Sequence, residues 1–440
     1  MNEHEVRWTA DAVKAIVSQF IGFMMDAYDL LLVTAMTNLL AKVFLPPSTP
    51  AWLSYFQLLF GYAFTLIGRP VGSAIFGNLG DKIGRRDTLI ITIAGFSAMS
   101  ALTGALPTYA QIGISAYIIF SAMRFIQGIF IGGEYAVGHT FSMEYAPIHR
   151  RGLASGIVQG AFSWGTALSA GVVAAFYALL GDQAMLSYGW RLVFLTGLIP
   201  AAVALYIRFG MKESPLFENI KTAGKVEKAP FFSIFKPPTL YTFLQVFVLM
   251  TGLFFSSYSL FNYANGILTG AGLSGGQAAF YYSMAGIFAA IAATFTGFIS
   301  DYIGRRKAFL IAAAVTFVMA VPTFYLWYIG AKTGNLAYLW IGTVLAGWMT
   351  QWPWGLVPTY LSERFPTNKR SSGVGFGYSS GLFISAWMSI YSIWLAPVFK
   401  PIQGYVPWFT AAFFLMLASV LYGIAAAIGP ETKGIRLSEI

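Results

Sequence analysis

Long apolar stretches separated by short polar turns run through the whole of this 440-residue chain. A helix of about 20 apolar residues crosses the roughly 30 Å hydrocarbon core of a bilayer, whereas the strands of a membrane barrel alternate over about ten residues. The helical pattern recurs near residues 14–44, 51–79, 88–107, 112–144, 153–180, 190–210, 238–267, 275–300, 307–329, 335–361, 371–396 and 405–429. It predicts an all-α membrane protein with twelve transmembrane helices.

Composition supports a lipid-facing surface. Hydrophobic residues make up 57% of the chain and charged residues only 10%, whereas about a quarter of the residues of a soluble protein are charged. The net charge is +10, but the basic residues fall in short loops between the spans and not on one face, so we expect no nucleic-acid partner. The chain has no cysteine, which excludes disulfides and thiol chemistry. The polar start and the long first apolar stretch argue against a cleavable signal peptide.

The basic loops predict the orientation in the membrane. They all fall on one side: Lys82, Arg85, Arg86, Arg150, Arg151, the lysines from Lys212 to Lys236, Arg305, Arg306, Lys307, Lys369, Arg370, Lys433 and Arg436. Basic loops stay in the cytoplasm. We therefore expect a multi-pass protein of the cell (plasma) membrane with both termini cytoplasmic.

Two motifs recur about 220 residues apart, as expected for duplicated helical repeats. Residues 81–86 (Asp-Lys-Ile-Gly-Arg-Arg) are echoed at 301–306, and the Glu-Pro-Arg pattern at 144, 147 and 151 returns at 363, 366 and 370. The repeat predicts two six-helix bundles, residues 1–210 and 238–440, joined by a polar cytoplasmic linker at 211–237. Such a duplication is the design of a carrier. We expect gating ion pairs among Asp81, Arg85, Glu144, Arg151, Asp301, Arg305, Glu363 and Arg370.

Ionisable residues inside the spans are the next signal, because each costs several kcal/mol in a bilayer and marks a functional site by default. The clear cases are Asp26, Asp29, Arg69, Arg124 and Glu134, all in the first half. Helical depth places Asp26, Arg69 and Glu134 near the midplane and allows Asp29 to pair with Arg124. Three acids and two arginines become neutral when one proton binds. A structural ion-pair network between the first, second and fourth spans is the alternative interpretation.

The loop at 77–86, its repeat and the segment at 430–434 resemble signatures of the major facilitator superfamily over the whole chain. Three further stretches resemble its proton-driven organic-anion symporters, of the sialate/monocarboxylate and metabolite:proton groups. They are residues 26–29 (Asp-Ala-Tyr-Asp), 68–72 (Gly-Arg-Pro-Val-Gly), and 124–128 with 133–135. Phosphate:proton symporters share the first stretch but carry an acid in helix 7 and a lysine in helix 11, which this chain lacks. The glutamine pair of sugar porters in helix 7 is absent too.

The resemblance implies a monomeric carrier that couples proton entry to uptake of a small organic anion, with a carboxylate as the expected substrate. It links the acid and arginine at Asp29 and Arg124 to proton coupling, together with Asp26 and Glu134. Arginine matches a carboxylate bidentately, so Arg69 is the expected anion anchor. The other pocket candidates are Tyr135, Gln159, Asn262, Gln351 and Tyr378. Phosphate:proton symport, proton-driven efflux and a transport-dead sensor remain alternatives. We expect no enzymatic activity, metal or cofactor.

Overall fold

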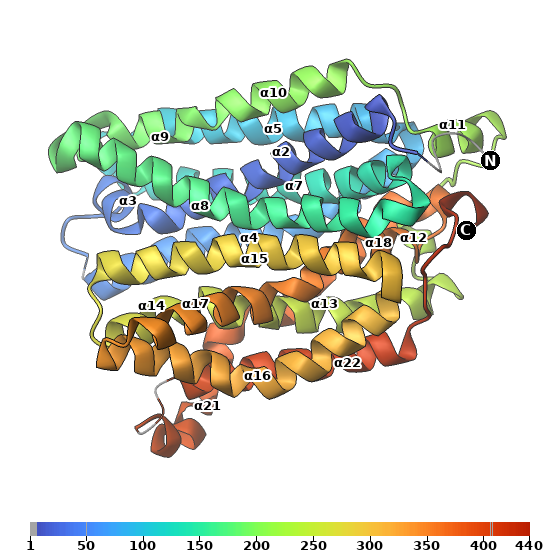
Figure 1. Ribbon diagram of the computed structural model, residues 1–440. Helices are drawn as coiled ribbons and strands as arrows, with labels where there is room; N and C mark the ends of the chain where they lie inside the picture. Colours follow the sequence, from blue (N-terminus) through green and yellow to red (C-terminus); the bar gives the residue numbers. More distant parts are fainter. Residues whose placement is uncertain (1–6, 50, 405, 407) are drawn as a thin grey trace.

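The computed structural model describes residues 7–49, 51–404, 406 and 408–440, with the backbone alone at 51–63 and 403. Its helices run side by side in two halves, α2 to α10 and α13 to α22, and the two termini lie at the same end (Figure 1). Helices α8 and α15 adjoin where the halves meet. This side-by-side arrangement of long apolar helices is the predicted one.

The first half follows the predicted spans closely. Its helices are α2 (Ala10–Ala35), α3 (Thr37–Phe44), α4 (Ala51–Ile83), α5 (Arg85–Ala105), α6 (Tyr109–Ile112), α7 (Ser115–Tyr145), α8 (Arg151–Ala184), α9 (Trp190–Thr196) and α10 (Leu198–Phe209). Helices α8 and α9 are joined by a π-helical turn, Met185–Gly189. Two short helices, α11 (Pro215–Thr222) and α12 (Pro230–Ser233), occupy the polar stretch between the halves.

The second half has more interruptions. Its helices are α13 (Thr239–Phe261), α14 (Ala264–Gly270), α15 (Gly275–Ile303), α16 (Arg305–Thr333), α17 (Leu336–Gln351), α18 (Val357–Ser362), α19 (Arg370–Ser380), α20 (Leu382–Ser385), α21 (Met388–Gln403) and α22 (Phe409–Ile428). The α-helical path is interrupted after Phe261 and at the 3₁₀ turn Trp352–Leu356. Pro353 explains the second, because proline lacks the N–H that an α-helix needs.

Length and composition qualify nine helical stretches of the described chain as membrane spans, one of which, Ile148–Phe209, contains two successive spans. Close helix packing depends on glycine at several crossings. A Cβ atom on Gly72 of α4 would lie 1.8 Å from the carbonyl oxygen of Ile129 in α7, so only glycine permits this approach. Gly84 and Gly304, in the two repeated loops, have φ angles of 121° and 100°, which favour glycine for its missing Cβ.

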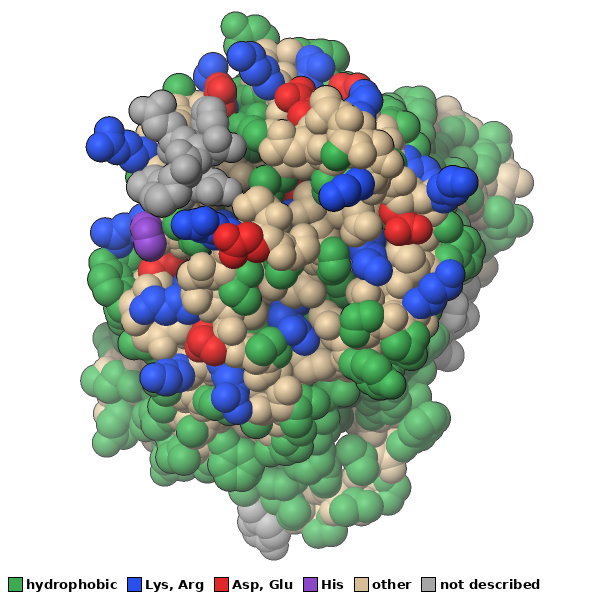
Figure 2. All heavy atoms as spheres, turned by 90° about the vertical axis from the view of Figure 1, so that its right-hand side faces the viewer, with side chains coloured by type: hydrophobic (Ala, Val, Ile, Leu, Met, Phe, Trp, Pro, Cys, Tyr) green, Lys and Arg blue, Asp and Glu red, His purple; other side chains and the backbone are tan. Residues whose placement is uncertain are grey.

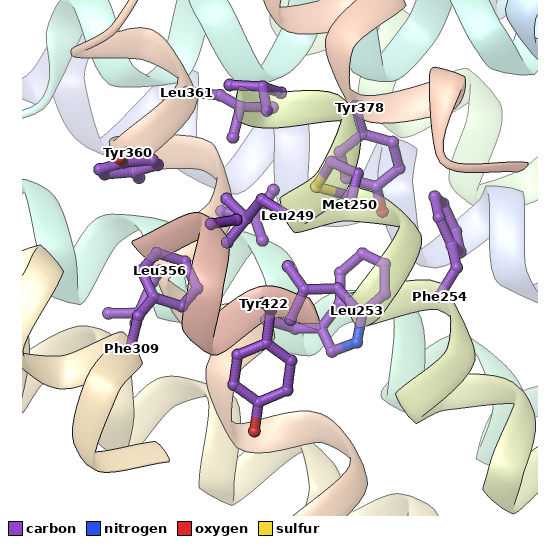
Figure 3. Close-up of a cluster of buried hydrophobic side chains, with 14 of the residues drawn as sticks. Leu249, Met250, Leu253, Phe254, Phe309, Leu356, Tyr360, Leu361, Tyr378 and Tyr422 are labelled. Atoms are coloured by element: carbon purple, nitrogen blue, oxygen red, sulfur yellow. The ribbon is translucent and has the colours of Figure 1, made fainter. Parts of the chain in front are cut away.

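The core of the second half surrounds α13. Leu249, Met250 and Leu253 pack against Phe309, Leu356, Tyr360, Leu361 and Tyr422 from neighbouring helices (Figure 3). Phe254 and Tyr378 continue this cluster toward the centre of the molecule, with their ring centroids 5.7 Å apart. The packed core therefore fixes the aromatic wall of the cavity described below.

Lysine, arginine and acidic side chains gather on the face of the molecule that carries both termini (Figure 2). Green apolar side chains surround this face at its margins. We call it the charged end; it includes Lys82, Arg86, Arg150, Arg306 and Lys433. The distribution matches a helical bundle with lipid around its sides and water at its ends.

Candidate substrate cavity and gating network

A cavity lies between the two halves and contains about 530 Å³ of space free of atoms, its opening included. Both halves contribute to its wall, which consists of Leu30, Leu66, Arg69, Gln159, Phe162, Ser163, Phe254, Ser257, Tyr258, Phe261, Ala293, Gln351, Trp354 and Tyr378. Apolar and aromatic walls with a few polar groups are typical of small-molecule sites. Four predicted pocket residues, Arg69, Gln159, Gln351 and Tyr378, line it.

Two predicted pocket residues do not line the cavity. Asn262 is the exposed residue that ends α13. The lining residues Phe254, Ser257, Tyr258 and Phe261 follow the three- and four-residue spacing of one helix face, and Asn262 lies a further 100° around the helix. Tyr135 is fully buried behind the wall, where its ring contacts that of Tyr378 at 4.5 Å. Asn262 and Tyr135 therefore lie outside the cavity wall in this conformation, and their part in substrate binding stays a prediction.

Arg69 is the one charged side chain among the described residues that line the cavity. It lies in α4, directly before Pro70, and is 3% exposed. Its Nε and Nη2 atoms are buried and form no hydrogen bond within the described structure. Unsatisfied guanidinium donors are costly away from water. An anion arriving in the cavity would satisfy them, so this arrangement is suited to binding one.

Asp26 is a second buried charged group with unsatisfied atoms. Both carboxylate oxygens of this α2 residue lack a partner among the described side chains and backbone. Asp26 is 0% exposed and interacts electrostatically with Glu134, Arg69 and Arg208. An ionised carboxylate with no hydrogen bond is expensive to bury, whereas a protonated one is much less so.

Asp29 has the opposite environment. Its Oδ2 atom accepts hydrogen bonds from Nη1 of Arg124 at 2.8 Å and from Nε2 of Gln127 at 2.5 Å, and its Oδ1 accepts one from Ser100 at 2.5 Å. The structure thus brings together Asp29 and Arg124, as the depth argument predicted. Three donors stabilise the ionised form of this carboxylate.

Glu134 pairs with an arginine that the sequence analysis missed. Arg208, in the last turn of α10, donates from Nη2 to Oε1 at 2.5 Å and from Nη1 to Oε2 at 2.9 Å. Thr92 adds a third hydrogen bond at 3.0 Å. Arg208 lies near the end of its predicted span, where an arginine normally marks a cytoplasmic loop, yet it is 2% exposed.

Arg208 changes the charge count of the buried cluster. The described cluster contains three acids, Asp26, Asp29 and Glu134, and three arginines, Arg69, Arg124 and Arg208. Its formal charge is zero when all six groups are ionised. The count made from the sequence, three acids and two arginines that become neutral with one bound proton, lacked Arg208. An anion bound at Arg69 would bring the sum to −1, and one proton would then restore neutrality.

At the charged end, each loop acid of the repeated motif contacts a helix of the opposite half. The Asp81 carboxylate accepts the backbone N–H groups of Ser371 and Ser372 at 3.0 and 2.8 Å, in the first turn of α19. The Asp301 carboxylate accepts those of Gly152 and Leu153 at 2.8 and 2.9 Å, in the first turn of α8. Carboxylates are favourable at helix N-termini, where free N–H groups and the helix dipole meet them.

The predicted gating ion pairs also cross between the halves. Glu144 pairs with Arg370 at 2.9 Å, and Glu363 pairs with Arg151 at 3.0 Å. Within each half, Arg85 lies 3.5 Å from Glu144 and Arg305 lies 3.3 Å from Glu363. The same two arginines also pair with Asp81 and Asp301, at 3.3 and 2.9 Å. The two repeats therefore form reciprocal ties between the halves at the charged end.

Two further acids extend the network and were missed from the sequence. Glu213, after α10, accepts the backbone N–H groups of Arg85 and Arg86 at 3.1 Å each. Glu431, after α22, accepts that of Arg305 at 2.7 Å. Burial raises the pKa of the Glu213 carboxyl above its ordinary value. The sequence did contain a signal for both acids, because each stands directly before a hydroxyl residue, Ser214 or Thr432. In the structure these hydroxyl groups bond Glu144 and Glu363.

The comparisons with known proteins agree with this architecture. Residues 15–386 match the family model described as Major Facilitator Superfamily, and the chain belongs to that superfamily. It is 29% identical over 402 residues to the "Inner membrane metabolite transport protein YhjE" of Escherichia coli strain K12, covering 89% of this chain and 90% of that one. It is also 29% identical over 403 residues to the "Ectoine/proline transporter ProP" of Corynebacterium glutamicum, covering 86% and 78%.

Solved structures share the fold. The proton:xylose symporter XylE bound to 6-bromo-6-deoxy-D-glucose superposes with a TM-score of 0.75 at 22% identity, covering 98% of each chain. The protein is a multi-pass membrane transporter and not an enzyme. The twelve predicted spans in two halves are confirmed by this fold.

Proposed function

We propose that the protein is a proton-coupled symporter that takes up a small organic anion, with a carboxylate as the substrate class. The observation that carries this proposal is Arg69, a buried guanidinium with two unsatisfied donors on the wall of a cavity between the halves. Among the described lining residues there is no aspartate or glutamate to neutralise it. The cavity therefore offers a positive site for a ligand that brings its own negative charge.

The charge count explains coupling. A bound carboxylate adds one negative charge to a buried cluster whose formal sum is zero. Burying an uncompensated charge is costly, so a proton is drawn in with the anion. Asp26 is our candidate for the proton site, because neither of its oxygens has another partner. Asp29 and Glu134 are each paired with an arginine instead.

Alternating access would follow from the reciprocal ties at the charged end. We place this end in the cytoplasm of the cell, with both termini, on the basis of its basic loops. The segment at 211–237 would link two bundles that move against each other as a monomer. The closed network then corresponds to a state shut toward the cytoplasm, and breaking it would open the cavity inward.

Reconstitution tests the proposal directly. Purified protein in proteoliposomes would be given a labelled panel of acetate, L-lactate, succinate, benzoate and phosphate, with and without an inward proton gradient. We expect one or more carboxylates to accumulate, and accumulation to collapse when a protonophore is added. Accumulation of phosphate alone, or proton-driven export instead of uptake, would replace the proposal by those alternatives.

A zwitterion is the second candidate, and one observation favours it. Aromatic rings of Phe162, Phe254, Tyr258, Phe261 and Trp354 line the cavity with Arg69. Aromatic faces attract quaternary ammonium groups, and a relative is named as an ectoine/proline transporter. A zwitterion adds no net charge, so its entry would need no compensating proton at Asp26. Glycine betaine in the same panel separates the two candidates by whether uptake requires the proton gradient.

A further inference from the structure

A row of buried polar side chains extends from the Glu134–Arg208 pair toward the cavity. Nη2 of Arg208 donates to Oε1 of Gln19 at 3.2 Å, and Nε2 of Gln19 lies 3.2 Å from Nδ1 of His139. Further along, Nε2 of Gln159 donates to the hydroxyl of Tyr378 at 3.4 Å. We call Arg208, Gln19, His139, Gln159 and Tyr378 the polar row. Gln159 and Tyr378 are also cavity-lining residues.

One link in the polar row is open in this conformation. Nε2 of His139 and Oε1 of Gln159 are both buried and both lack a hydrogen-bond partner in the described structure. The two side chains are nevertheless close enough to interact. A hydrogen bond from Nε2 of His139 to Oε1 of Gln159, direct or through one water, would satisfy both atoms.

Local packing holds the start of the row in place. A Cβ atom on Gly138 would lie 1.8 Å from Oε1 of Gln19, and one on Gly22 would lie 2.4 Å from Oε1 of Glu134. These glycines therefore leave the space that the two side chains occupy. The His139 ring itself packs edge-on against Phe23 and Tyr378, with centroids 4.8 and 5.8 Å apart. The start of the row, from Arg208 to His139, is therefore packed into the core.

The chemistry of arginine gives this row a direction. A guanidinium donates hydrogen bonds and accepts none, so Gln19 must turn its oxygen to Arg208 and its NH₂ group to His139. Nδ1 of His139 then has to accept, and a neutral imidazole carries its proton on Nε2. The unpartnered oxygen of Gln159 is the acceptor available to that N–H. The Gln159 NH₂ group in turn donates to the hydroxyl oxygen of Tyr378. The hydroxyl hydrogen of Tyr378 is then available for another acceptor.

We propose that His139 is a positioning residue, held as the Nε2–H tautomer, which orients Gln159 and Tyr378 as hydrogen-bond donors toward the substrate. The donor-only character of Arg208 is thereby passed through four side chains to the cavity wall. Together with Arg69, the wall then presents hydrogens to the ligand, the polarity that carboxylate oxygens accept. The role in anion binding rests on the proposed function, whereas the tautomer of His139 does not.

Nitrogen-15 NMR tests the tautomer without any substrate. The chain has three histidines, so His4→Gln and His149→Gln leave His139 as the single labelled imidazole. Long-range proton–nitrogen spectra of the folded protein near neutral pH should show a protonated Nε2 and an unprotonated Nδ1. A protonated Nδ1, an imidazolium or a mixture of tautomers in this protein would overturn the proposal.

Matched variants test the origin of the polarity. Arg208→Lys keeps a donor-only group and should preserve the tautomer. The double variant Arg208→Gln with Glu134→Gln leaves no unpaired charge but lets Gln19 turn around, so both tautomers should appear. Gln19→Leu removes the donor to Nδ1, so both tautomers should appear in this variant too. It provides the test if the double variant does not fold. A spectrum unchanged in the double variant and in Gln19→Leu would overturn the assignment to Arg208.

Transport tests the link to binding. For a carboxylate of the panel that the wild type accumulates, Tyr378→Phe removes the terminal hydrogen, and KM should rise about tenfold, the scale of one hydrogen bond. His139→Leu should raise KM similarly, with Vmax nearly unchanged. Unchanged KM in both variants would show that the polar row is structural only. Failure of all carboxylate transport would refute the proposed function while the NMR result stands by itself.

Discussion

Asp26 and Asp29 lie one turn apart on α2, yet their surroundings differ in kind. Asp29 accepts hydrogen bonds from Arg124, Gln127 and Ser100, which stabilise its charge. Asp26 accepts none within the described structure and faces Glu134, a second acid. A proton that enters with an anion has a reason to bind Asp26 and none to displace the donors around Asp29.

The first prediction separates these two acids. Asp26→Asn mimics a permanently protonated side chain, so substrate exchange should continue while proton-driven accumulation is lost. Asp29→Asn should instead leave Arg124 buried without its acid, which destabilises the protein by about 3–5 kcal/mol. Uptake with and without a proton gradient, together with the melting temperature, checks both. Accumulation by Asp26→Asn comparable to the wild type would show that another group carries the proton.

The second prediction concerns the geometry of Arg69. Arg69→Lys retains the positive charge but loses the planar fork that holds a carboxylate at two points. Affinity for the transported anion should weaken by about 1.5–3 kcal/mol, the scale of a charge-assisted hydrogen bond. Calorimetric titration of the purified variant measures this loss. Equal affinity in Arg69→Lys and Arg69→Ala, with both variants folded, would make Arg69 a structural residue.

For single residues, the sequence indicates which charged side chains are buried better than it indicates their ion-pair partners. Depth along a helix was sufficient to pair Asp29 with Arg124. Depth was not sufficient for Arg208, because the last turn of a span is normally wet and only packing against α2, α5 and α7 buries it. Asn262 lies one residue beyond Phe261, which lines the cavity, because the face of α13 toward the cavity is set by packing of the whole bundle.

Among the elements, the pair α4 and α7 carries the buried arginines Arg69 and Arg124. Glycines bring the two backbones together at several levels. A Cβ on Gly132 of α7 would lie 2.1 Å from the carbonyl oxygen of Arg69, and one on Gly72 of α4 would lie 1.8 Å from that of Ile129. Such close approach is typical of membrane helices, which associate through small residues. The pair therefore acts as a rigid support for Arg69.

The third prediction tests this support. Gly72→Ala places a methyl group against backbone that has no room for it, so we expect destabilisation by about 1–3 kcal/mol and weaker substrate binding through a displaced Arg69. The matched control is Gly171→Ala in α8, where a Cβ atom meets nothing within 4 Å. That change should be neutral or slightly stabilising. Thermal unfolding in detergent that gave the same shift for both variants would contradict the packing argument.

The spans were readable from the sequence because a bilayer demands about 20 apolar residues per helix. Their interruptions were only partly readable. Proline at 353 marks the break before α18, whereas the break at Met36 between α2 and α3 carries no proline or glycine. That bend is set by tertiary contacts of Leu39, Leu40 and Phe44 in the core at the far end of the first half, which no local pattern encodes.

At the scale of the whole molecule, the repeated motif of each half binds the other half at the charged end. Asp81 caps α19 and Asp301 caps α8, while Glu144 binds Arg370 and Glu363 binds Arg151. The sequence predicted these residues as gating groups from their repetition, but not which residue binds which. Pairing across the halves depends on how the two bundles meet, through α8 against α15 and α4 against α19. Under the proposed alternating access, all four ties would break together if the halves separated at this end.

The fourth prediction concerns that separation. Glu144→Gln leaves Arg370, which is 0% exposed, without its acid partner, whereas Arg85 still has a second acid partner. The penalty for one unpaired buried charge is about 3–5 kcal/mol, and it applies only while this end is closed, because water reaches the arginine once it opens. A shift of that size changes the ratio of closed to open molecules more than a hundredfold. Glu363→Gln should act likewise on Arg151.

Spin labels measure this shift, and the chain has no cysteine to interfere. Lys82→Cys and Lys307→Cys place labels on exposed helix ends, the last turn of α4 and the first turn of α16. Their distance distribution should lengthen in Glu144→Gln and in Glu363→Gln. Glu439→Gln is the matched control, since its pair with Arg436 at 3.3 Å is exposed at the same end and contributes little. Distances that stay short in both buried variants, or lengthen equally in the control, would mean that the ion pairs do not hold the halves together. Lengthening confined to the buried variants would identify them as the closing force at the charged end.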